Sequence, residues 1–517
     1  MASAIRASMI PLLLLAGATG CGPGPDGGLA LELRFGALEQ AQTGAGLPEA
    51  LAGLRVDITA DDPGGPALAS SGCLGLGPDA SQRHGLSLDL EPGADRLVVA
   101  SGWTTADCSG QPSWRGVAPG VDVVAGQETT VELFVPPWGQ QLVALPAALP
   151  GPRAFASTTA LPDGKLLVAG GFARAVHSGG AVELEAACDA WIFDPGAGRV
   201  ERVLPMDACR GLHSALALAD GRVLLAGGCS RARFDPRGTG RPRLRPQVDA
   251  LVAGASLYDP ASGRFSSAGS DLMLARAGAA AARLDDGRVL LAGGRSAGVL
   301  RSDELLLGTP DEAGINWQIA AQRLVSGRAG AGAAAGDGGL WLVGGNAYDA
   351  APVEWIDGDD LQPQAAAIAD PALALVGHSV RSHPASGVLI TGGSTTVPGS
   401  PATAALELLA GDAAAPQRQS FSLAAARSLH ASAWLGDPAD GRLAVIGGLG
   451  AESSSRADVE LVAVGAAGTL LEAELTAGAI GPAAARIPGG AVVILGGLDV
   501  DAEGLIEMAG SGQLLSP

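Results

Sequence analysis

Apolar and polar residues alternate along most of this chain, in short runs that turn residues separate. Before residue 136, five such runs occur, at 29–35, 54–60, 86–92, 96–103 and 129–135. Alternation with a period of two predicts β-strands with one buried face, and turn residues between the runs favour antiparallel neighbours. We therefore predict an antiparallel β-sandwich over residues 29–136, with a length typical of immunoglobulin-like or transthyretin-like modules.

The rest of the chain repeats one phrase: a turn with glycine at its corner, four or five mostly apolar residues, and a Gly-Gly pair. The second glycine of the pair falls at residues 171, 228, 294, 345, 393, 448 and 497. Each copy predicts a hairpin, because a glycine turn supplies positive φ and a glycine pair lets neighbouring backbone approach closely. In the copy at 255–294 we expect four strands, of which the Ala-rich stretch 278–284 lines a crowded centre.

This repeat resembles that of the kelch family, over about residues 140–505, although the tyrosine and tryptophan typical of that family are mostly missing. The resemblance implies a β-propeller with one four-stranded blade per roughly 50 residues. We expect an all-β chain with seven blades over 138–517; a six-bladed ring is the alternative. The run 141–147 is predicted to close the ring as the outer strand of the last blade, and 505–510 to form that blade's third strand.

The first 20 residues read as a targeting segment. Arg6 precedes a short apolar stretch, and the sequence Ala18-Thr19-Gly20-Cys21 resembles a bacterial lipoprotein lipobox. The resemblance implies cleavage before Cys21, lipid on its sulfur and a flexible tether over 21–28. We expect a protein of the cell envelope, held at the outer membrane of a Gram-negative bacterium. An ordinary secretory signal with an incidental cysteine is the alternative.

The chain is strongly acidic. Its 53 acidic residues outnumber 33 basic ones, which gives a net charge of −20. This balance argues against binding to nucleic acid or to an anionic membrane surface. We therefore expect a monomer that touches the membrane through its lipid only, with an envelope protein or an anionic saccharide as its partner.

Five cysteines remain after Cys21, and an exported protein permits disulfides. Cys73 and Cys108 are alone in the N-terminal region, so we predict that they pair. The others are Cys188, Cys209 and Cys229. Cys209–Cys229 is our first prediction and Cys188–Cys209 the competing one, because cysteine spacing alone does not decide connectivity.

Arginines recur at the start of each predicted inner strand. The members in register are Arg153, Arg210, Arg276, Arg328 and Arg427, whereas Arg381 and Arg486 are out of register. In a propeller these positions surround the mouth of the central channel, so one hypothesis is a guanidinium ring that captures an anion. The competing hypothesis is structural: each arginine binds backbone carbonyls between blades.

The longest interval between glycine pairs contains a basic insertion at 230–246. Arg231, Arg233 and Arg237 are among its six arginines, which face one aspartate. Long loops on rigid scaffolds often bind ligands, so we treat these residues as candidates for a polyanion or an acidic protein. The alternative is a solvated, disordered loop.

We predict no catalytic residue, metal or cofactor. Some kelch-type propellers are copper-radical oxidases that need two tyrosines and two histidines, but this chain has only Tyr258 and Tyr348, and His378 and His383 lack a tight metal-ligand spacing. The predicted function is non-catalytic binding or scaffolding at the envelope. The alternative is a carbohydrate-active propeller enzyme of the mutarotase or lyase type.

Overall fold

The computed structural model describes the chain in segments. They are 11–16, 28–35, 51–60, 65–76, 85–86, 91–125, 127–178, 181–235, 243–268, 275–336, 338–345, 351–366, 368, 370–383, 387–395, 402–411, 416–464, 469–501 and 505–517. In these segments the protein is all-β, as predicted, and its helical turns are the 3-10 turns η2 (Val248–Ala250), η4 (Pro371–Leu373) and η5 (Pro438–Asp440). No helix in this part of the chain is long and apolar enough to cross a bilayer.

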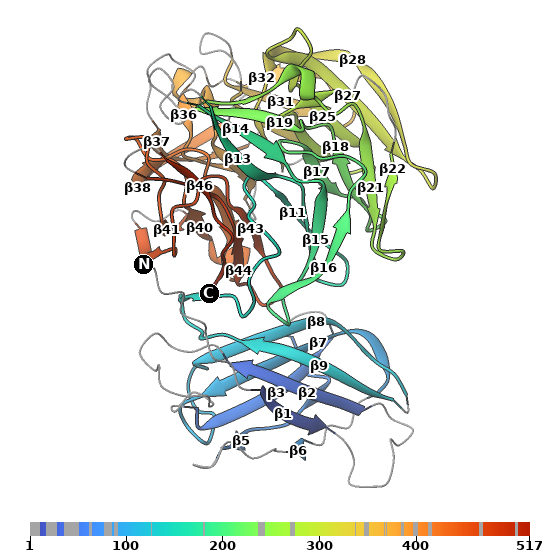
Figure 1. Ribbon diagram of the computed structural model, residues 1–517, viewed down its shortest axis with the longest axis vertical. Helices are drawn as coiled ribbons and strands as arrows, with labels where there is room; N and C mark the ends of the chain where they lie inside the picture. Colours follow the sequence, from blue (N-terminus) through green and yellow to red (C-terminus); the bar gives the residue numbers. More distant parts are fainter. Residues whose placement is uncertain are drawn as a thin grey trace.

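The N-terminal region is a sandwich of two sheets (Figure 1). One sheet has the order β6 (Gly85–Leu86), β1 (Pro11–Ala16), β2 (Gly28–Phe35) and β9 (Glu128–Val135). The other has the order β4 (Ala69–Ser70), β3 (Gly53–Thr59), β7 (Gly93–Trp103) and β8 (Trp114–Val123), with β5 (Leu74–Gly75) also on β3. Side chains such as Leu31, Val56 and Trp114 fill the core between them.

Two features of the sandwich differ from the prediction. Strands β2 and β9 pair in parallel, so the sandwich is not wholly antiparallel. Strand β8 was missed because Gly116, Pro119 and Gly120 interrupt its alternation. The predicted targeting segment contributes β1, which pairs with β2; the proposed cleavage site at Cys21 lies outside the described residues.

In the described part of residues 142–515, seven four-stranded antiparallel sheets share one pattern, in which the strand that ends at a glycine pair is an inner strand of the sheet. The first sheet contains β11 (Ser157–Ala160), β12 (Leu166–Ala169), β15 (Asp189–Asp194) and β16 (Arg199–Pro205). The second contains β17 (Ser214–Ala217), β18 (Val223–Ala226), β21 (Ala255–Asp259) and β22 (Arg264–Ser267). The third contains β24 (Ala280–Arg283), β25 (Val289–Ala292), β27 (Ser302–Pro310) and β28 (Ile315–Arg328). The fourth sheet contains β29 (Gly332–Gly336), β30 (Gly339–Val343), β31 (Val353–Asp357) and β32 (Pro363–Ala365). The fifth contains β34 (Ser379–Ser382), β35 (Val388–Thr391), β37 (Thr403–Ala410) and β38 (Gln417–Arg427). The sixth contains β39 (Ala431–Trp434), β40 (Arg442–Ile446), β41 (Asp458–Ala463) and β42 (Thr469–Glu474).

The last sheet joins the two ends of this region. It consists of β43 (Ala483–Arg486), β44 (Val492–Leu495), β47 (Gly512–Leu515) and, at its outer edge, β10 (Leu142–Ala144). The predicted outer strand is therefore present, since Leu142 pairs with Leu515. The predicted third strand at 505–510 is wrong: β46 (Ile506–Met508) instead pairs with β45 (Leu498–Val500) in a separate hairpin.

The glycine pairs join each sheet to the next. The second glycine of every pair donates its N–H to a carbonyl that begins the following repeat, for example Gly228 to Arg276 and Gly294 to Arg328, both at 2.8 Å. The seventh of these bonds runs from Gly497 back to Arg153 in the first repeat. The first glycine is needed for space as well, because a Cβ at Gly293 would lie 2.6 Å from the Arg328 carbonyl oxygen.

The segments that follow the glycine pairs build further small sheets. One of them is a separate four-stranded sheet, which we call the lid sheet. It consists of β13 (Phe172–Ser178), β14 (Ala181–Ala186), β19 (Arg231–Asp235) and β20 (Arg243–Pro246). Two short ladders join β23 (Arg276–Ala277) to β26 (Arg295–Ser296) and β33 (Leu375–Val376) to β36 (Ser394–Thr395). The basic insertion is thus partly strand rather than loop; residues 236–242 lie outside the described part.

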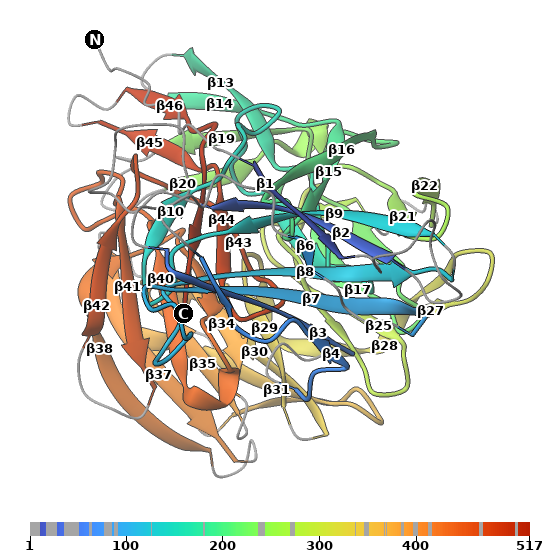
Figure 2. The same cartoon turned by 90° about the horizontal axis from the view of Figure 1, so that it is seen from below.

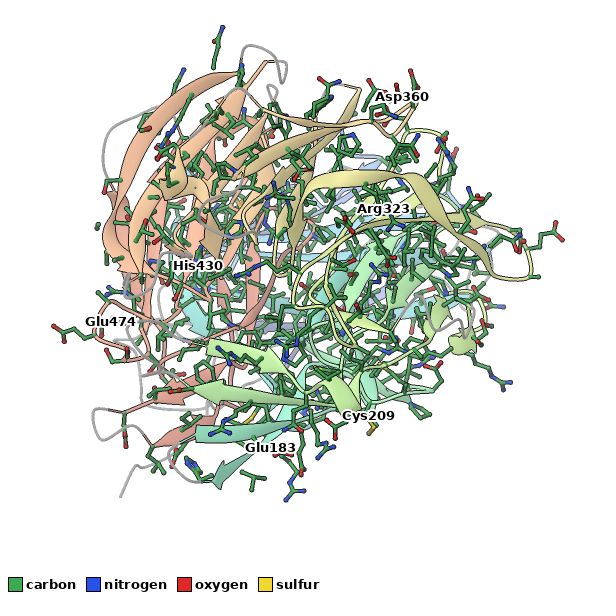
Figure 3. The ribbon with its side chains drawn as sticks, turned by 90° about the horizontal axis from the view of Figure 1, so that it is seen from above. Glu183, Cys209, Arg323, Asp360, His430 and Glu474 are labelled. Atoms are coloured by element: carbon green, nitrogen blue, oxygen red, sulfur yellow. A yellow bond between two sulfur atoms is a disulfide. The ribbon has the colours of Figure 1, made fainter. Side chains whose placement is uncertain are left out.

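The sandwich and the lid sheet lie against opposite ends of the seven sheets (Figures 1 and 2). The sandwich meets the hairpin turns: the Phe134 N–H donates to the Gly196 carbonyl at 2.6 Å, and Arg199 pairs with Glu132 at 2.8 Å. The glycine pairs are at the far ends of the same strands. The face away from the sandwich, seen in Figure 3, therefore carries the loops that are free to form a site.

The disulfides resolve the cysteine predictions. Cys73–Cys108 forms as predicted. The competing bond, Cys188–Cys209, forms in place of Cys209–Cys229. The first prediction is wrong because the Cys229 side chain is fully buried in an apolar cluster with Phe172 and Phe234, whereas Cys209 bonds to the exposed Cys188. Burial raises the pKa of the Cys229 thiol to about 12, so it stays protonated.

Candidate functional site

The recurring arginines are buried and bind their own repeat. Arg210, Arg328 and Arg427 are 0% exposed. A terminal guanidinium nitrogen (Nη1) of each donates to the carbonyl of the first glycine in its own pair, at 2.7–3.1 Å. Arg276 does the same to Gly293 at 2.8 Å. Each guanidinium thus satisfies a carbonyl that the glycine turn leaves without a strand partner.

Carboxylates on the third strand neutralise these guanidinium groups. Arg328 binds Glu354 at 2.7 Å, with both side chains fully buried, and Arg276 binds Glu304 at 2.9 Å. Arg427 binds Asp458 and Glu460. Arg153 binds Asp189 and lies over the Trp191 ring, 4.5 Å from its centre.

The hypothesis of an anion-binding ring at Arg153, Arg210, Arg276, Arg328 and Arg427 is therefore corrected. Their donors face glycine carbonyls and carboxylates of their own repeat, so these arginines stabilise the fold, although they do not connect one blade to the next as the competing hypothesis expected. The two arginines out of register also bond within the fold: Arg381 donates to the Ser432 carbonyl and Arg486 to the Gly436 carbonyl.

Three histidines occupy one repeated position, three residues after the arginine or its equivalent. His213, His378 and His430 each pack on the first glycine of the preceding repeat. The Nε2 atoms of His213 and His430 hydrogen-bond the hydroxyls of Ser157 and Thr391 at 2.8 Å. Burial lowers the pKa of His213 and His430 to about 3 and that of His378 to about 4, so all three are neutral near pH 7.

Left-handed residues recur at one position of the seven repeats and are hydrogen-bonded to one another; we call them the collar. Its members stand two residues after each arginine position: Phe155, Leu212, Gly278, Gly330, Gly377, Leu429 and Gly481, with φ between +53° and +73°. Neighbouring members are hydrogen-bonded, for example Phe155 N–H to Gly481 O at 2.6 Å and Leu429 N–H to Gly377 O at 2.6 Å. Bulky residues rarely adopt this conformation, and such strain concentrates at functional sites.

A pocket of about 440 Å³ opens above this collar, and we call it the mouth pocket. Phe155, Leu212 and Leu429 form its apolar floor, and Leu244 and Pro246 of the lid sheet form one wall. A pocket of this volume, mostly apolar with a few polar groups, is typical of small-molecule sites.

Three arginines line the mouth pocket from the inserted segments. Arg245 comes from β20, Arg295 from β26, and Arg301 directly precedes β27. Among the described residues, none of these guanidinium groups has a carboxylate within ion-pair distance, in contrast to the buried arginines below them. The buried hydroxyls of Ser394 and Ser428, also in the lining, have no hydrogen-bond partner in the described part.

His378 completes the polar lining. Its Nε2–H donates to the Val343 carbonyl at 3.1 Å, so the neutral ring carries its lone pair on Nδ1. That buried Nδ1 has no hydrogen-bond partner among the described residues.

Sequence reasoning found part of this site. Arg245 belongs to the predicted basic insertion, but the residues singled out there fare differently: Arg231 pairs with Glu183 and Asp249, Arg233 is exposed away from the pocket, and Arg237 lies outside the described residues. Arg295 and Arg301 were missed. The signal available for Arg295 was its place directly after a glycine pair, where the repeat gives way to an insertion.

The comparisons with known proteins bear on the fold. No family model and no curated protein matches the chain. Among solved structures, the chain is similar to a novel fungal alcohol oxidase of the AA5 family in complex with copper. The TM-score is 0.53 at 17% identity, over 74% of this chain and 76% of the other.

This likeness corrects the predicted function. The neighbour is an enzyme, so the prediction of a non-catalytic binding or scaffolding protein is overturned in favour of its enzymatic alternative.

The described residues of this chain do not fit a copper centre. No group of three histidine, cysteine, aspartate or glutamate side chains is arranged to hold a metal in the described segments. Tyr258 packs against Phe265 between two sheets, and Tyr348 lies outside the described residues. His383 contacts Trp434 and does not join His378. We therefore derive no chemistry through copper.

Proposed function

We propose that this protein is a carbohydrate-active enzyme of the lyase type, which acts on an anionic saccharide in the mouth pocket. The observation that carries the proposal is the set of three arginines, Arg245, Arg295 and Arg301, around one pocket without a carboxylate partner among the described residues. On a chain with net charge −20, such a group attracts an anion that the rest of the surface repels.

The proposal includes a closed seven-bladed propeller of the kelch type as the frame. It is supported by the cycle of glycine N–H bonds that ends with Gly497 on Arg153, and by the pairing of β10 with β47. Contacts between successive first strands support it too, including the hydroxyls of Ser379 and Ser432 at 2.6 Å. A ring of this kind holds loops from several blades around one mouth without further ordering cost.

The chemistry follows from the arginines. A uronate carboxylate bound by guanidinium groups loses much of its negative charge, and the C–H bond beside it becomes more acidic. A base takes that proton, the electron pair forms a carbon–carbon double bond, and the bond to the glycosidic oxygen at the next carbon breaks. The departing oxygen takes a proton from solvent.

His378 is the proposed base. Its tautomer, held by Val343, leaves Nδ1 able to accept a proton. Burial keeps the pKa of the empty site low, at about 4, and a bound anion beside the ring raises it, because an opposite charge favours the imidazolium. Substrate binding therefore increases the basicity of this group when it is needed.

The envelope location remains part of the proposal. The lipobox-like residues before Cys21 support a lipid anchor. An anchored enzyme of this kind acts as a monomer on saccharides at the outer membrane.

The test uses the chain with Cys21→Ser, which cannot be lipidated. Polygalacturonate, alginate and neutral dextran are incubated with it, and the ultraviolet absorbance of the new double bond is followed. We expect product from a polyuronate and none from dextran. His378→Gln should reduce kcat at least about 100-fold with little change in KM, whereas Arg301→Ala should mainly raise KM. Absence of product from every polyuronate, with a folded protein, contradicts the proposal.

A further inference from the structure

A second hollow, of about 580 Å³, lies on the sandwich, and we call it the sandwich pocket. Its floor is the face of β3, β7 and β8 that points away from the sandwich core. Arg55, Asp57 and Thr59 line it from β3, whereas their neighbours Val56 and Ile58 face the core. The hollow combines these polar side chains with the apolar Val99 and Trp103, whereas the face behind it is part of the apolar core.

Two arginines flank a serine across three adjacent strands. In the strand register Ser101 pairs with Arg55 on one side and with Arg115 on the other. Since neighbouring strands lie about 4.8 Å apart, the two arginine Cα atoms are about 10 Å apart, and both guanidinium groups reach the space above Ser101.

Tryptophans hold both guanidinium groups. The Arg55 guanidinium lies 5.3 Å from the centre of the Trp103 ring, and Arg115 lies 5.2 Å from that of Trp138. Arg55 donates its Nε–H to Asp57 at 2.8 Å, and 43% of its side chain is exposed. Such stacking fixes the arginines before a ligand arrives, which reduces the ordering cost of binding.

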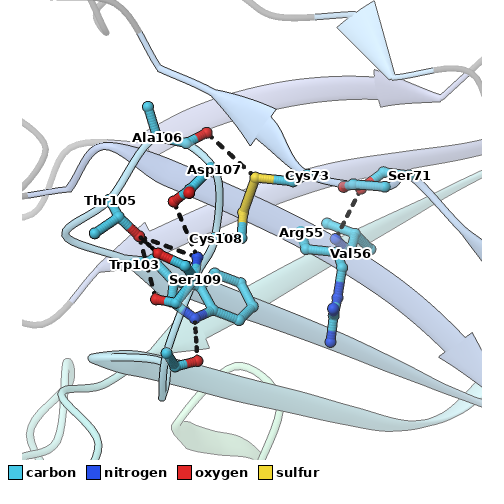
Figure 4. Close-up of a disulfide and its surroundings, with 12 residues drawn as sticks. Arg55, Val56, Ser71, Cys73, Trp103, Thr105, Ala106, Asp107, Cys108 and Ser109 are labelled. Carbon is cyan, nitrogen blue, oxygen red and sulfur yellow. Dashed lines mark hydrogen bonds between the residues drawn. A yellow bond between two sulfur atoms is a disulfide. The ribbon is translucent and has the colours of Figure 1, made fainter.

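Figure 4 shows how the rim beside Arg55 and Trp103 is fixed. The Cys73–Cys108 disulfide ties the rim to the sandwich, and the Trp103 indole N–H donates to the Gly110 carbonyl at 3.0 Å. Cys108 and Gly110 both belong to the pocket lining.

The lining of the sandwich pocket contains a buried threonine, Thr59, whose hydroxyl can bind a ligand. Thr59 is 2% exposed, and its Oγ1 has no hydrogen-bond partner in the described part of the chain. An unpaired hydroxyl at such depth costs stability unless something fills the pocket and bonds to it.

We propose that the sandwich pocket binds a polyol that carries an oxyanion, as a uronic acid or a sugar phosphate does. In the pocket lining the two arginines, Arg55 and Arg115, outnumber the single carboxylate, Asp57, which favours an oxyanion, and Thr59, Ser101 and Gln111 offer partners for hydroxyls. Trp103 is 4% exposed under Arg55, so it presents no open ring face on which a neutral sugar could stack. This inference does not depend on the proposed function.

The experiment titrates the Cys21→Ser chain with glucuronate, glucose 6-phosphate and glucose, by calorimetry and tryptophan fluorescence. Fluorescence separates the two pockets, because Trp103 and Trp138 line this one and no described tryptophan lines the mouth pocket. We expect at least one anion to bind with a fluorescence change, and its identity tells whether the oxyanion is a carboxylate or a phosphate. Glucose should bind at least about tenfold more weakly.

Variants locate the ligand. Arg55→Ala should weaken binding about tenfold or more, and Arg96→Ala, on β7 outside the pocket lining, should leave it unchanged. Thr59→Val should weaken binding several-fold while the melting temperature stays the same or rises, since no described partner loses a bond. Binding of neither anion, equal binding of glucose, or unchanged binding in both Arg55→Ala and Thr59→Val overturns this proposal. Binding lost in Arg301→Ala but kept in Arg55→Ala overturns it too, and leaves the proposed function intact.

Discussion

Arg328 ends β28 and Arg301 directly precedes β27, the neighbouring strand of the same sheet, yet the two arginines have different roles. Arg328 is fully buried and donates to Glu354 and to three backbone carbonyls. Arg301 stands outside the repeat, lines the mouth pocket and has no ion-pair partner in the described segments. The difference teaches that residues which recur with the repeat maintain the frame, whereas residues where the repeat is interrupted are available for function.

A fall in pH should lower the free energy of unfolding more than any of the substitutions described below. His213, His378 and His430 are neutral in the folded protein, with pKa values of about 3 to 4, and titrate near 6.5 when unfolded. The unfolded state therefore binds more protons below pH 6.5, and stability falls as the pH drops from there towards 4. Between pH 7 and 5 each histidine should cost about 2 kcal/mol of unfolding free energy.

Denaturant titrations at several pH values measure this effect. His430→Gln should remove about one third of the pH dependence, because one of the three buried histidines is then absent. A flat pH dependence between 7 and 5 would show that these histidines are not buried as neutral groups.

Removal of one buried arginine of the repeat should have the next largest effect on the free energy of unfolding. Arg328→Ala leaves the Glu354 carboxylate buried without its counter-charge and should cost about 3–5 kcal/mol. Arg174→Ala is the control, because that arginine is 71% exposed and pairs with Glu185 on the lid sheet; it should cost less than about 1 kcal/mol. Urea denaturation compares the two, and equal losses would erase the distinction between frame and surface arginines.

Two glycines separate backbone strain from close packing. A Cβ at Gly293 would meet the Arg328 carbonyl, whereas one at Gly287 would meet nothing within 4 Å, although both have positive φ. Gly293→Ala should cost about 2–4 kcal/mol and Gly287→Ala about 1–2 kcal/mol. If thermal unfolding ranks them in the reverse order, the pairs do not serve the contact between sheets.

The mouth arginines should matter least for stability. Arg301→Ala should change the unfolding free energy by no more than about 0.5 kcal/mol, while it weakens binding of an oligogalacturonate about tenfold. Calorimetric binding and thermal unfolding on one preparation give both numbers. If Arg301→Ala binds the oligogalacturonate normally but has a lower melting temperature, Arg301 stabilises the fold and does not bind the ligand.

The repeated four-stranded sheets could be predicted from the sequence, because the residues that form each hairpin and glycine pair are close together in the chain. Each glycine pair meets the next repeat at a distance that excludes a side chain, so the same two residues recur wherever a sheet begins against its neighbour. The Ala-rich strand of the copy at 255–294 follows the same logic: it was predicted at 278–284 and occurs as β24, Ala280–Arg283.

The site could be predicted only in part, because non-local pairing creates it. In the lid sheet Val182 pairs with Phe234, from a segment that follows a different glycine pair. Arg245, Arg295 and Arg301 meet at one pocket from two insertions that share no period. Burial also decides what a recurring arginine does, and nothing in its spacing distinguishes a guanidinium that binds a ligand from one that binds Glu354.

The most direct test is a crystal structure of the Cys21→Ser protein with a galacturonate oligosaccharide. The account predicts sugar density in the mouth pocket, with one carboxylate bound by Arg245, Arg295 or Arg301 and the adjacent carbon facing His378. Sugar bound to the mouth pocket with its carboxylates turned to solvent, or bound only elsewhere on the molecule, would contradict it.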